Sequence, residues 1–125
     1  MHQLLLGFIA CLLFSMAAFA QDPVSTDGDK YKVIFENDCV RVLDYKDSPG
    51  EKTQQHRHPA FVVYALSTFK RSIALPDGKI LQRQFNAGDV MWSNSQVHIG
   101  INTGDTPTHV ILVEMKPGIG ACAQK

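Results

Sequence analysis

The sequence has no excess of charge of either sign. Its 12 lysine and arginine residues balance its 12 aspartate and glutamate residues over 125 positions. A nucleic-acid-binding domain usually has a basic excess or stripe, and an acidic disordered tail has the reverse, so neither class fits. The chain is also too short for two domains, because one self-sufficient core needs about 100–150 residues. These absences leave a single globular domain.

Several common catalytic signatures are also missing, and so is a second apolar run of membrane length. The sequence has no Ser-His-Asp spacing, no glycine-rich phosphate loop and no nucleophilic cysteine motif. The one long apolar run extends from Leu4 to Ala20 without a charged residue and ends in Ala18-Phe19-Ala20. Small residues at these positions are typical of a signal-peptidase site, which predicts cleavage before Gln21 and a periplasmic or secreted protein, free of the membrane. An uncleaved membrane anchor is the alternative.

Cleavage would divide the chain and change its cysteine count. We predict a signal peptide over residues 1–20, a flexible leader over 21–30, one domain over 31–116 and a C-terminal tail over 117–125. Cys11 would leave with the signal peptide, so that Cys39 and Cys122 remain of the three cysteines. In an oxidising compartment these two can form a disulfide, with two free thiols as the alternative.

The rest of the chain is typical of an all-β domain. No 12-residue window keeps a helical period, and short runs rich in valine, isoleucine, phenylalanine and tyrosine alternate with turn residues such as Pro76-Asp77-Gly78. This pattern indicates a β-sandwich or a small barrel. We predict strands over residues 31–36, 39–46, 53–58, 60–66, 69–75, 79–85, 89–92, 97–102 and 108–115.

The histidines are the strongest candidates for a functional site. His56 and His58 are two positions apart in an extended segment, so their imidazole rings face the same side. Two adjacent imidazoles suit a first-row transition metal, and His98 from another strand would complete a set of three. Gln54 would lie on the same face if the strand is regular, and His109 begins the last strand, so both are possible ligands or pocket residues. A polar surface strand without metal is the alternative.

The spacing of these residues resembles the two sequence motifs of the cupins. Five residues separate Gly50 from His56-Arg57-His58, and Gly88 precedes a second block in which His98 stands four positions before Asn102. The resemblance implies a double-stranded β-helix, which is a jelly-roll-like barrel and often dimeric. It also implies a divalent transition metal, such as zinc, iron, nickel or manganese, bound by the matched histidines. The glutamate of the first motif would fall at position 62 or 63, where the chain has valine, so the implied site has reduced charge.

A narrower resemblance concerns the small cupins described as β-alanine degradation proteins. It supports the fold and the site more than any particular substrate. The small-molecule ligand is expected instead from the barrel, because a barrel of this size encloses room for one small ligand. The matching segments are Glu36-Asn37-Asp38, Val40-Arg41-Val42-Leu43, Pro49-Gly50, His56-Arg57-His58-Pro59, Leu66-Ser67, Ala87-Gly88, Asn102-Thr103-Gly104-Asp105-Thr106 and Val113-Glu114.

Candidate pocket residues follow from the same strands. Arg41 can bind a carboxylate through two parallel hydrogen bonds, with an ion-paired strand residue as the alternative. Tyr64 and Trp92 are candidates for the pocket wall, with core packing as the alternative. Three functions remain open: a metal-dependent enzyme acting on a small acid, a ligand-binding cupin without turnover, and a structural barrel without metal. A homodimer is expected, because strands that are apolar on both faces need additional cover.

Overall fold

The structure is a computed structural model that describes residues 21–116, 118 and 122. The predicted signal peptide, and all of the predicted tail apart from residues 118 and 122, lie outside the described residues. Residues 21–116 contain one short helix and nine strands: α1 (Pro23–Thr26), β1 (Tyr31–Glu36), β2 (Val40–Asp47), β3 (His56–His58), β4 (Phe61–Ala65), β5 (Phe69–Ala74), β6 (Ile80–Phe85), β7 (Val90–Ser93), β8 (Gln96–Asn102) and β9 (Thr108–Met115).

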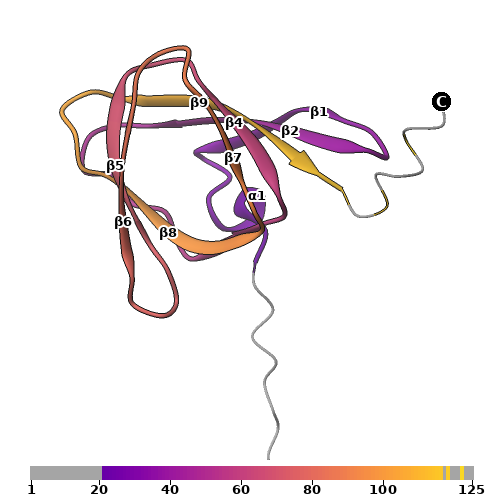
Figure 1. The fold of residues 1–125 in the computed structure, drawn as a ribbon, viewed down its shortest axis with the longest axis horizontal. Coiled ribbons are helices and arrows are strands. Elements are labelled where there is room, and N and C mark those ends of the chain that lie inside the picture. Colours follow the sequence, from indigo (N-terminus) through magenta and orange to yellow (C-terminus); the bar gives the residue numbers. More distant parts are fainter. Residues whose placement is uncertain (1–20, 117, 119–121, 123–125) are drawn as a thin grey trace, which may run out of the picture.

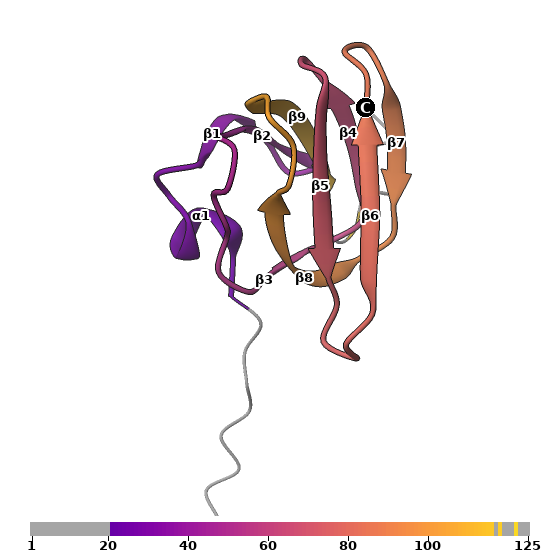
Figure 2. The same ribbon diagram turned by 90° about the vertical axis from the view of Figure 1, so that its left-hand side faces the viewer.

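Two antiparallel sheets make up the domain (Figures 1 and 2). One has the strand order β1-β2-β9-β4-β7 and the other the order β3-β8-β5-β6. Neighbours in each sheet are mostly distant in sequence, as in the pairing of β2 with β9, so the sheets form only when the whole domain folds. This arrangement brings the histidines of β3 and β8 into adjacent strands, with His56 directly opposite His98.

Alternation along the strands separates a common interior from the surface. Along β9, buried and half-buried side chains alternate over the full strand, because successive side chains point to opposite faces of a sheet. Both sheets contribute to the core, which is therefore shared between them. Its buried residues are Tyr31, Leu43, Tyr45, Phe61, Val63, Ala65, Phe69, Phe85, Val110 and Leu112.

The prediction of an all-β chain is confirmed, and all but one of the predicted strands begin and end within one residue of the observed ones. Glycine turns separate several of them, and Gly78 has the positive φ of 88° that a residue with a side chain rarely adopts. The exception is β3, which begins at His56 rather than at position 53. Gln54 consequently lies before the strand, where its backbone is not held in a regular ladder.

Residues 21–30, expected as a flexible leader, are packed against the domain instead. Asp22 caps α1 by accepting a hydrogen bond from the Val24 amide at 2.8 Å, and Pro23 occupies the first helical position, where its missing N–H costs nothing. The helix lies beside β1 and β3 (Figure 1). The Gln21 carbonyl accepts a hydrogen bond from the Arg57 amide in β3, so this segment adds to the wall behind the histidines.

A disulfide joins Cys39, just before β2, to Cys122 near the end of the chain. The Cα atoms are 5.8 Å apart, and the cysteines are separated by 83 positions in sequence. In the chain-entropy model, closing a loop of that length stabilises the folded state by about 4.5 kcal/mol. The sequence left a disulfide and two free thiols as alternatives, and the structure contains the disulfide.

Within the part of the chain that the structure describes, no helix has the length and apolar character needed to cross a membrane.

Candidate metal centre

Three histidines meet at one end of the barrel interior. His56 and His58 come from β3 and His98 from the adjacent β8, and one ring nitrogen from each lies within 4.8 Å of the other two. The Nε2 atoms of His56 and His58 are 3.1 Å apart. All three side chains are buried, with His56 and His58 fully shielded from solvent. The structure thus brings together the three histidines that the sequence predicts as a set.

Hydrogen bonds on the outer nitrogens fix how the rings are oriented. His56 donates from Nδ1 to the carbonyl of residue 54 at 2.9 Å, and His98 donates from Nδ1 to Oε1 of Gln96 at 2.7 Å. His58 donates from Nδ1 to Oε2 of Glu114 at 2.7 Å. Each partner atom is an oxygen acceptor, so each Nδ1 carries the proton. Each Nε2 therefore keeps a lone pair available to the interior.

Burial keeps the imidazoles of His56 and His98 uncharged. Burial, reinforced by the neighbouring His58, lowers the pKa of His56 from 6.5 to about 4. Burial and the other two histidines lower the pKa of His98 to about 2. Neutral imidazoles are the form that binds a metal ion. The donor set thus fits a transition metal, because β3 and β8 bring one ring nitrogen from each of three buried histidines within 4.8 Å of one another.

Glu114 is a site residue that sequence reasoning missed. Burial alone would raise the pKa of its carboxyl, but the hydrogen bonds from His58 and Arg41 lower it below its ordinary value. Arg41 contacts Oε1 of Glu114 at 2.7 Å and the Asp22 carboxylate at 2.6 Å. A charged residue at an inward position of β9, among apolar neighbours such as Leu112, was the available signal. Its partner in β3 could not be inferred without the strand order.

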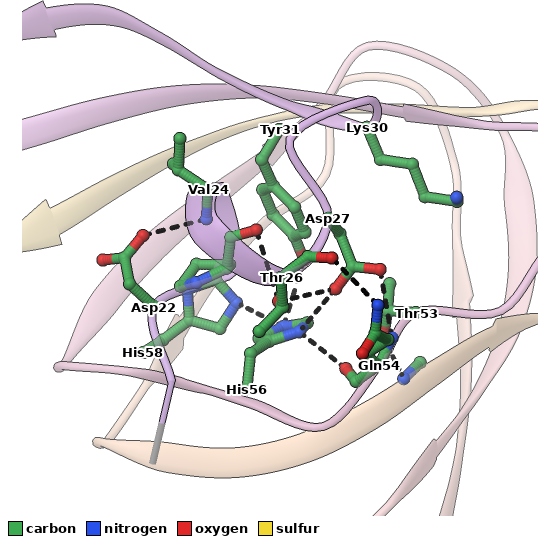
Figure 3. Close-up of polar contacts among 12 residues, drawn as sticks. Asp22, Val24, Thr26, Asp27, Lys30, Tyr31, Thr53, Gln54, His56 and His58 are labelled. Atoms are coloured by element: carbon green, nitrogen blue, oxygen red, sulfur yellow. Dashed lines mark hydrogen bonds and ion pairs between the residues drawn. The ribbon is translucent and has the colours of Figure 1, made fainter. Parts of the chain in front are cut away.

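Asp27 is the second residue missed, and it supports the same wall from the N-terminal segment. Its Oδ1 accepts a hydrogen bond from the Gln54 amide at 3.0 Å, and its Oδ2 lies 3.5 Å from Nδ1 of His56 (Figure 3). Figure 3 shows the segment that contains Asp22, Thr26 and Asp27 folded over His56 and His58. The segment was expected to be flexible, and so it offered no reason to look for a site residue there.

Two predicted site residues lie beside the cluster without entering it. Gln54 offers the site its backbone carbonyl, while its side chain donates to the Thr26 carbonyl. Arg41 is ion-paired behind Glu114 rather than in the cavity. The Thr26 carbonyl holds the side chain of Gln54 away from the interior. The carboxylates of Glu114 and Asp22 do the same for Arg41.

Two others point away from the barrel interior. His109 is on the outer face of β9, where its Nε2 contacts Asp44 at 2.6 Å. Tyr64 is 44% exposed on the outer face of β4. Strand alternation accounts for both corrections, because the neighbours of each residue along the strand are the buried ones.

A cavity of about 320 Å³ opens beside the histidines. His58 and His98 line one part of it, while Tyr31 and Tyr45 line another. Trp92, predicted as a pocket residue, borders the cavity with 55% of its surface exposed.

The first cupin motif lacks its carboxylate in the structure as in the sequence. Of the two positions where a glutamate was expected, Val62 is half-buried and Val63 is in the core. The histidine cluster therefore receives no carboxylate from β4.

Arg71 and Arg83 give the cavity positive charge. They are directly opposite each other on β5 and β6, and both line the cavity. Arg71 contacts Asp47 at 3.2 Å and Tyr45 at 3.3 Å. Gly100 on β8 makes room for it, because a Cβ there would collide with the Arg71 guanidinium. Among residues 21–116 no carboxylate lies within ion-pair distance of Arg83, whereas Arg71 is paired with Asp47.

Comparisons with known proteins agree with this architecture. A cupin domain from Bordetella pertussis Tohama I matches with a TM-score of 0.63 and 28% identity, covering 69% of this chain and 91% of its own. The chain has a cupin fold. A double-stranded β-helix protein from Klebsiella pneumoniae is 24% identical with a TM-score of 0.55, covering 70% of this chain and 76% of its own. No family model and no curated protein matches this cupin-fold chain.

An enzyme of known activity shares the fold alone. Oxalate decarboxylase from Lactobacillus farciminis matches with a TM-score of 0.52 and 23% identity, and the match covers 66% of this chain but 25% of the enzyme. The predicted double-stranded β-helix is confirmed by these structures. The narrower resemblance to the β-alanine degradation proteins stays a prediction.

Proposed function

We propose that this cupin-fold protein binds one divalent transition metal through His56, His58 and His98, together with a small carboxylate in the adjacent cavity. The observation that supports the metal is the orientation of the rings: each Nδ1 is engaged by an oxygen, and the Nε2 atoms converge. When bound, a metal at such a site supplies a Lewis acid or a redox centre. Zinc, iron, nickel and manganese are the candidates.

The charge of the cavity supports an anionic ligand. Like charges directly opposite in a sheet are destabilising, and Arg71 and Arg83 face each other with only Arg71 paired to a carboxylate. A carboxylate in the cavity would relieve that repulsion. A volume of about 320 Å³ lies at the lower end of the range for ligand pockets, which favours a small acid.

Elemental analysis of protein purified without chelator or histidine tag tests the metal. We expect about one metal ion per chain, and loss of that ion from the His56→Ala/His58→Ala/His98→Ala variant. His109→Ala is the matched control, because His109 contacts Asp44 outside the cluster. A wild-type protein that contains none of these four metals, or a triple variant that retains the metal, would contradict the proposal.

Ligand binding without turnover is the second candidate, and the absence of a glutamate at positions 62 and 63 favours it. Turnover assays on small carboxylates, β-alanine included, distinguish it from catalysis.

We further propose that the protein is exported and that it forms a homodimer. Export is supported by the sequence of residues 1–20, which has the apolar run and small final residues of a signal peptide. The apolar edge strand β1 supports the dimer, because Val33, Ile34 and Phe35 are all exposed on it.

A further inference from the structure

A buried tyrosine faces the histidine cluster. Tyr31 is the first residue of β1 and is 5% exposed. Its Oη lies 3.3 Å from Nε2 of His56, the nitrogen that faces the interior (Figure 3). The ring packs against both histidines of β3, with centroid distances of 5.3 Å to His56 and 5.7 Å to His58. The phenol oxygen thus lies where the lone pairs converge.

Two separations, from His56 Nε2 to Tyr31 Oη and to His58 Nε2, match the spacing of ligands around one small metal ion. Tetrahedral bonds of about 2.0–2.1 Å place ligand atoms roughly 3.3–3.4 Å apart. The observed separations are 3.3 Å between Tyr31 Oη and His56 Nε2 and 3.1 Å between His56 Nε2 and His58 Nε2. Glu114 does not compete for this place, because its carboxylate is turned to Nδ1 of His58 and to Arg41.

We propose that Tyr31 is the fourth protein ligand of the metal centre, bound through its phenolate oxygen. The inference rests on the proposed three-histidine site. On binding, the phenol O–H bond breaks, the oxygen binds the metal, and the proton leaves to solvent. The phenolate supplies one negative charge, which replaces the charge of the carboxylate missing at positions 62 and 63. Tyrosinate is an established ligand of iron in proteins.

Tyr45 provides a matched control within the same pocket. Its ring lies 4.5 Å from that of Tyr31, and both line the cavity. The Tyr45 hydroxyl is engaged elsewhere, since it donates to Asp47 and accepts from Arg71. The third tyrosine of the chain, Tyr64, is exposed on the outer face of β4. A spectroscopic signal from a metal-bound phenolate can therefore be assigned among only three residues.

The test is the visible absorption of protein loaded with ferrous iron and oxidised with ferricyanide. A phenolate bound to ferric iron gives a visible charge-transfer band, whereas histidine ligands alone do not. We expect the band in wild type, Tyr45→Phe and Tyr64→Phe, and its loss in Tyr31→Phe at unchanged iron content. Zinc affinity should also fall about tenfold or more in Tyr31→Phe and stay within about twofold in Tyr45→Phe.

The other outcomes also decide whether Tyr31 binds the metal. Wild-type protein that binds iron without the band overturns the role of Tyr31 and leaves the three-histidine site intact. Wild-type protein that binds neither iron nor zinc overturns both proposals. If Tyr31→Phe fails to fold, resonance Raman excitation within the band identifies phenolate ring modes in wild type. Their persistence in Tyr45→Phe and Tyr64→Phe then assigns them to Tyr31, and their absence from wild type refutes the assignment.

Discussion

Glu114 shows how one residue can serve the site without facing its centre. Its carboxylate accepts one hydrogen bond from Nδ1 of His58 and another from the guanidinium of Arg41. Replacing the carboxylate by an amide keeps the shape of the side chain but removes the charge that orients and polarises the imidazole. We expect Glu114→Gln to weaken zinc affinity by about 10–100-fold, as is typical for such supporting partners.

Chelator competition measures that change. Glu36→Gln is the control, because Glu36 pairs with Lys116 on the surface at 3.0 Å. Equal zinc affinities in Glu114→Gln and wild type would show that the Glu114 carboxylate has no role in holding His58 for a metal.

Arg83 is the residue on which the anionic ligand depends most directly. It lines the cavity opposite Arg71 and has no ion-pair partner within residues 21–116. A hydrogen bond to a charged group contributes about 1.5–3 kcal/mol, so we expect Arg83→Gln to weaken binding of a small carboxylate by roughly tenfold or more. Isothermal titration against a panel of small acids measures the effect. Arg57→Gln is the control, since Arg57 is exposed on β3, and equal losses in both variants would argue against a cavity site.

At the scale of the element, the N-terminal segment holds β3 in place. Asp27 is 4% exposed and accepts the Gln54 amide, directly before the strand of His56 and His58. Its removal leaves that amide without a partner, which costs about 1–3 kcal/mol. We expect Asp27→Ala to lower the free energy of unfolding by this amount in urea titrations. Asp29→Ala should change it by less than about 0.5 kcal/mol, because the Asp29 side chain is 72% exposed.

Sequence patterns predicted the strands well and their partners poorly. Runs such as Thr108–Met115 are rich in valine and isoleucine and follow turn residues, so their bounds can be predicted from composition, whereas their alternation in burial appears only in the structure. The helix α1 was missed because its four residues lie in a polar stretch, although Asp22-Pro23 is a recognisable start signal. The three histidines followed from spacing, whereas Glu114 and Asp27 depend on contacts over 56 and 27 positions. Such contacts are set by strand order and register, which local patterns do not contain.

At the scale of the whole molecule, the buried histidines make stability depend on pH. The folded pKa values of His56, about 4, and His98, about 2, lie below the unfolded value of 6.5. The unfolded chain therefore takes up protons first as pH falls, and the stability present above pH 6.5 is lost below it. For metal-free protein we expect a loss of up to about 1.4 kcal/mol per pH unit for each histidine.

Urea unfolding at about pH 7, 6 and 5 in the presence of chelator measures this loss. Replacing His98 by Asn should reduce the slope, because the variant lacks one of the two histidines with a lowered pKa. A free energy of unfolding that stays constant over this range would show that the histidines are not buried as neutral groups.

The assembly is the second property of the whole molecule that can be tested. Ile34 on the edge strand β1 is 56% exposed, next to Phe35 at 53%. We expect light scattering to give twice the chain mass for wild type and the chain mass for Ile34→Glu. Ile80→Glu is the control, because Ile80 is equally exposed, at 54%, at the start of β6. A monomeric wild type, or a dimer that persists in Ile34→Glu, would place the apolar edge outside any interface.

Gly100 determines where the side chain of Arg71 can lie in the cavity. The position tolerates no side chain while Arg71 occupies its present place, because the first carbon would collide with the guanidinium. A related chain that acquires alanine there must also give up or redirect the arginine. Glycine at position 100 therefore lets Arg71 point into the cavity, whereas a residue with a side chain there would turn the guanidinium elsewhere.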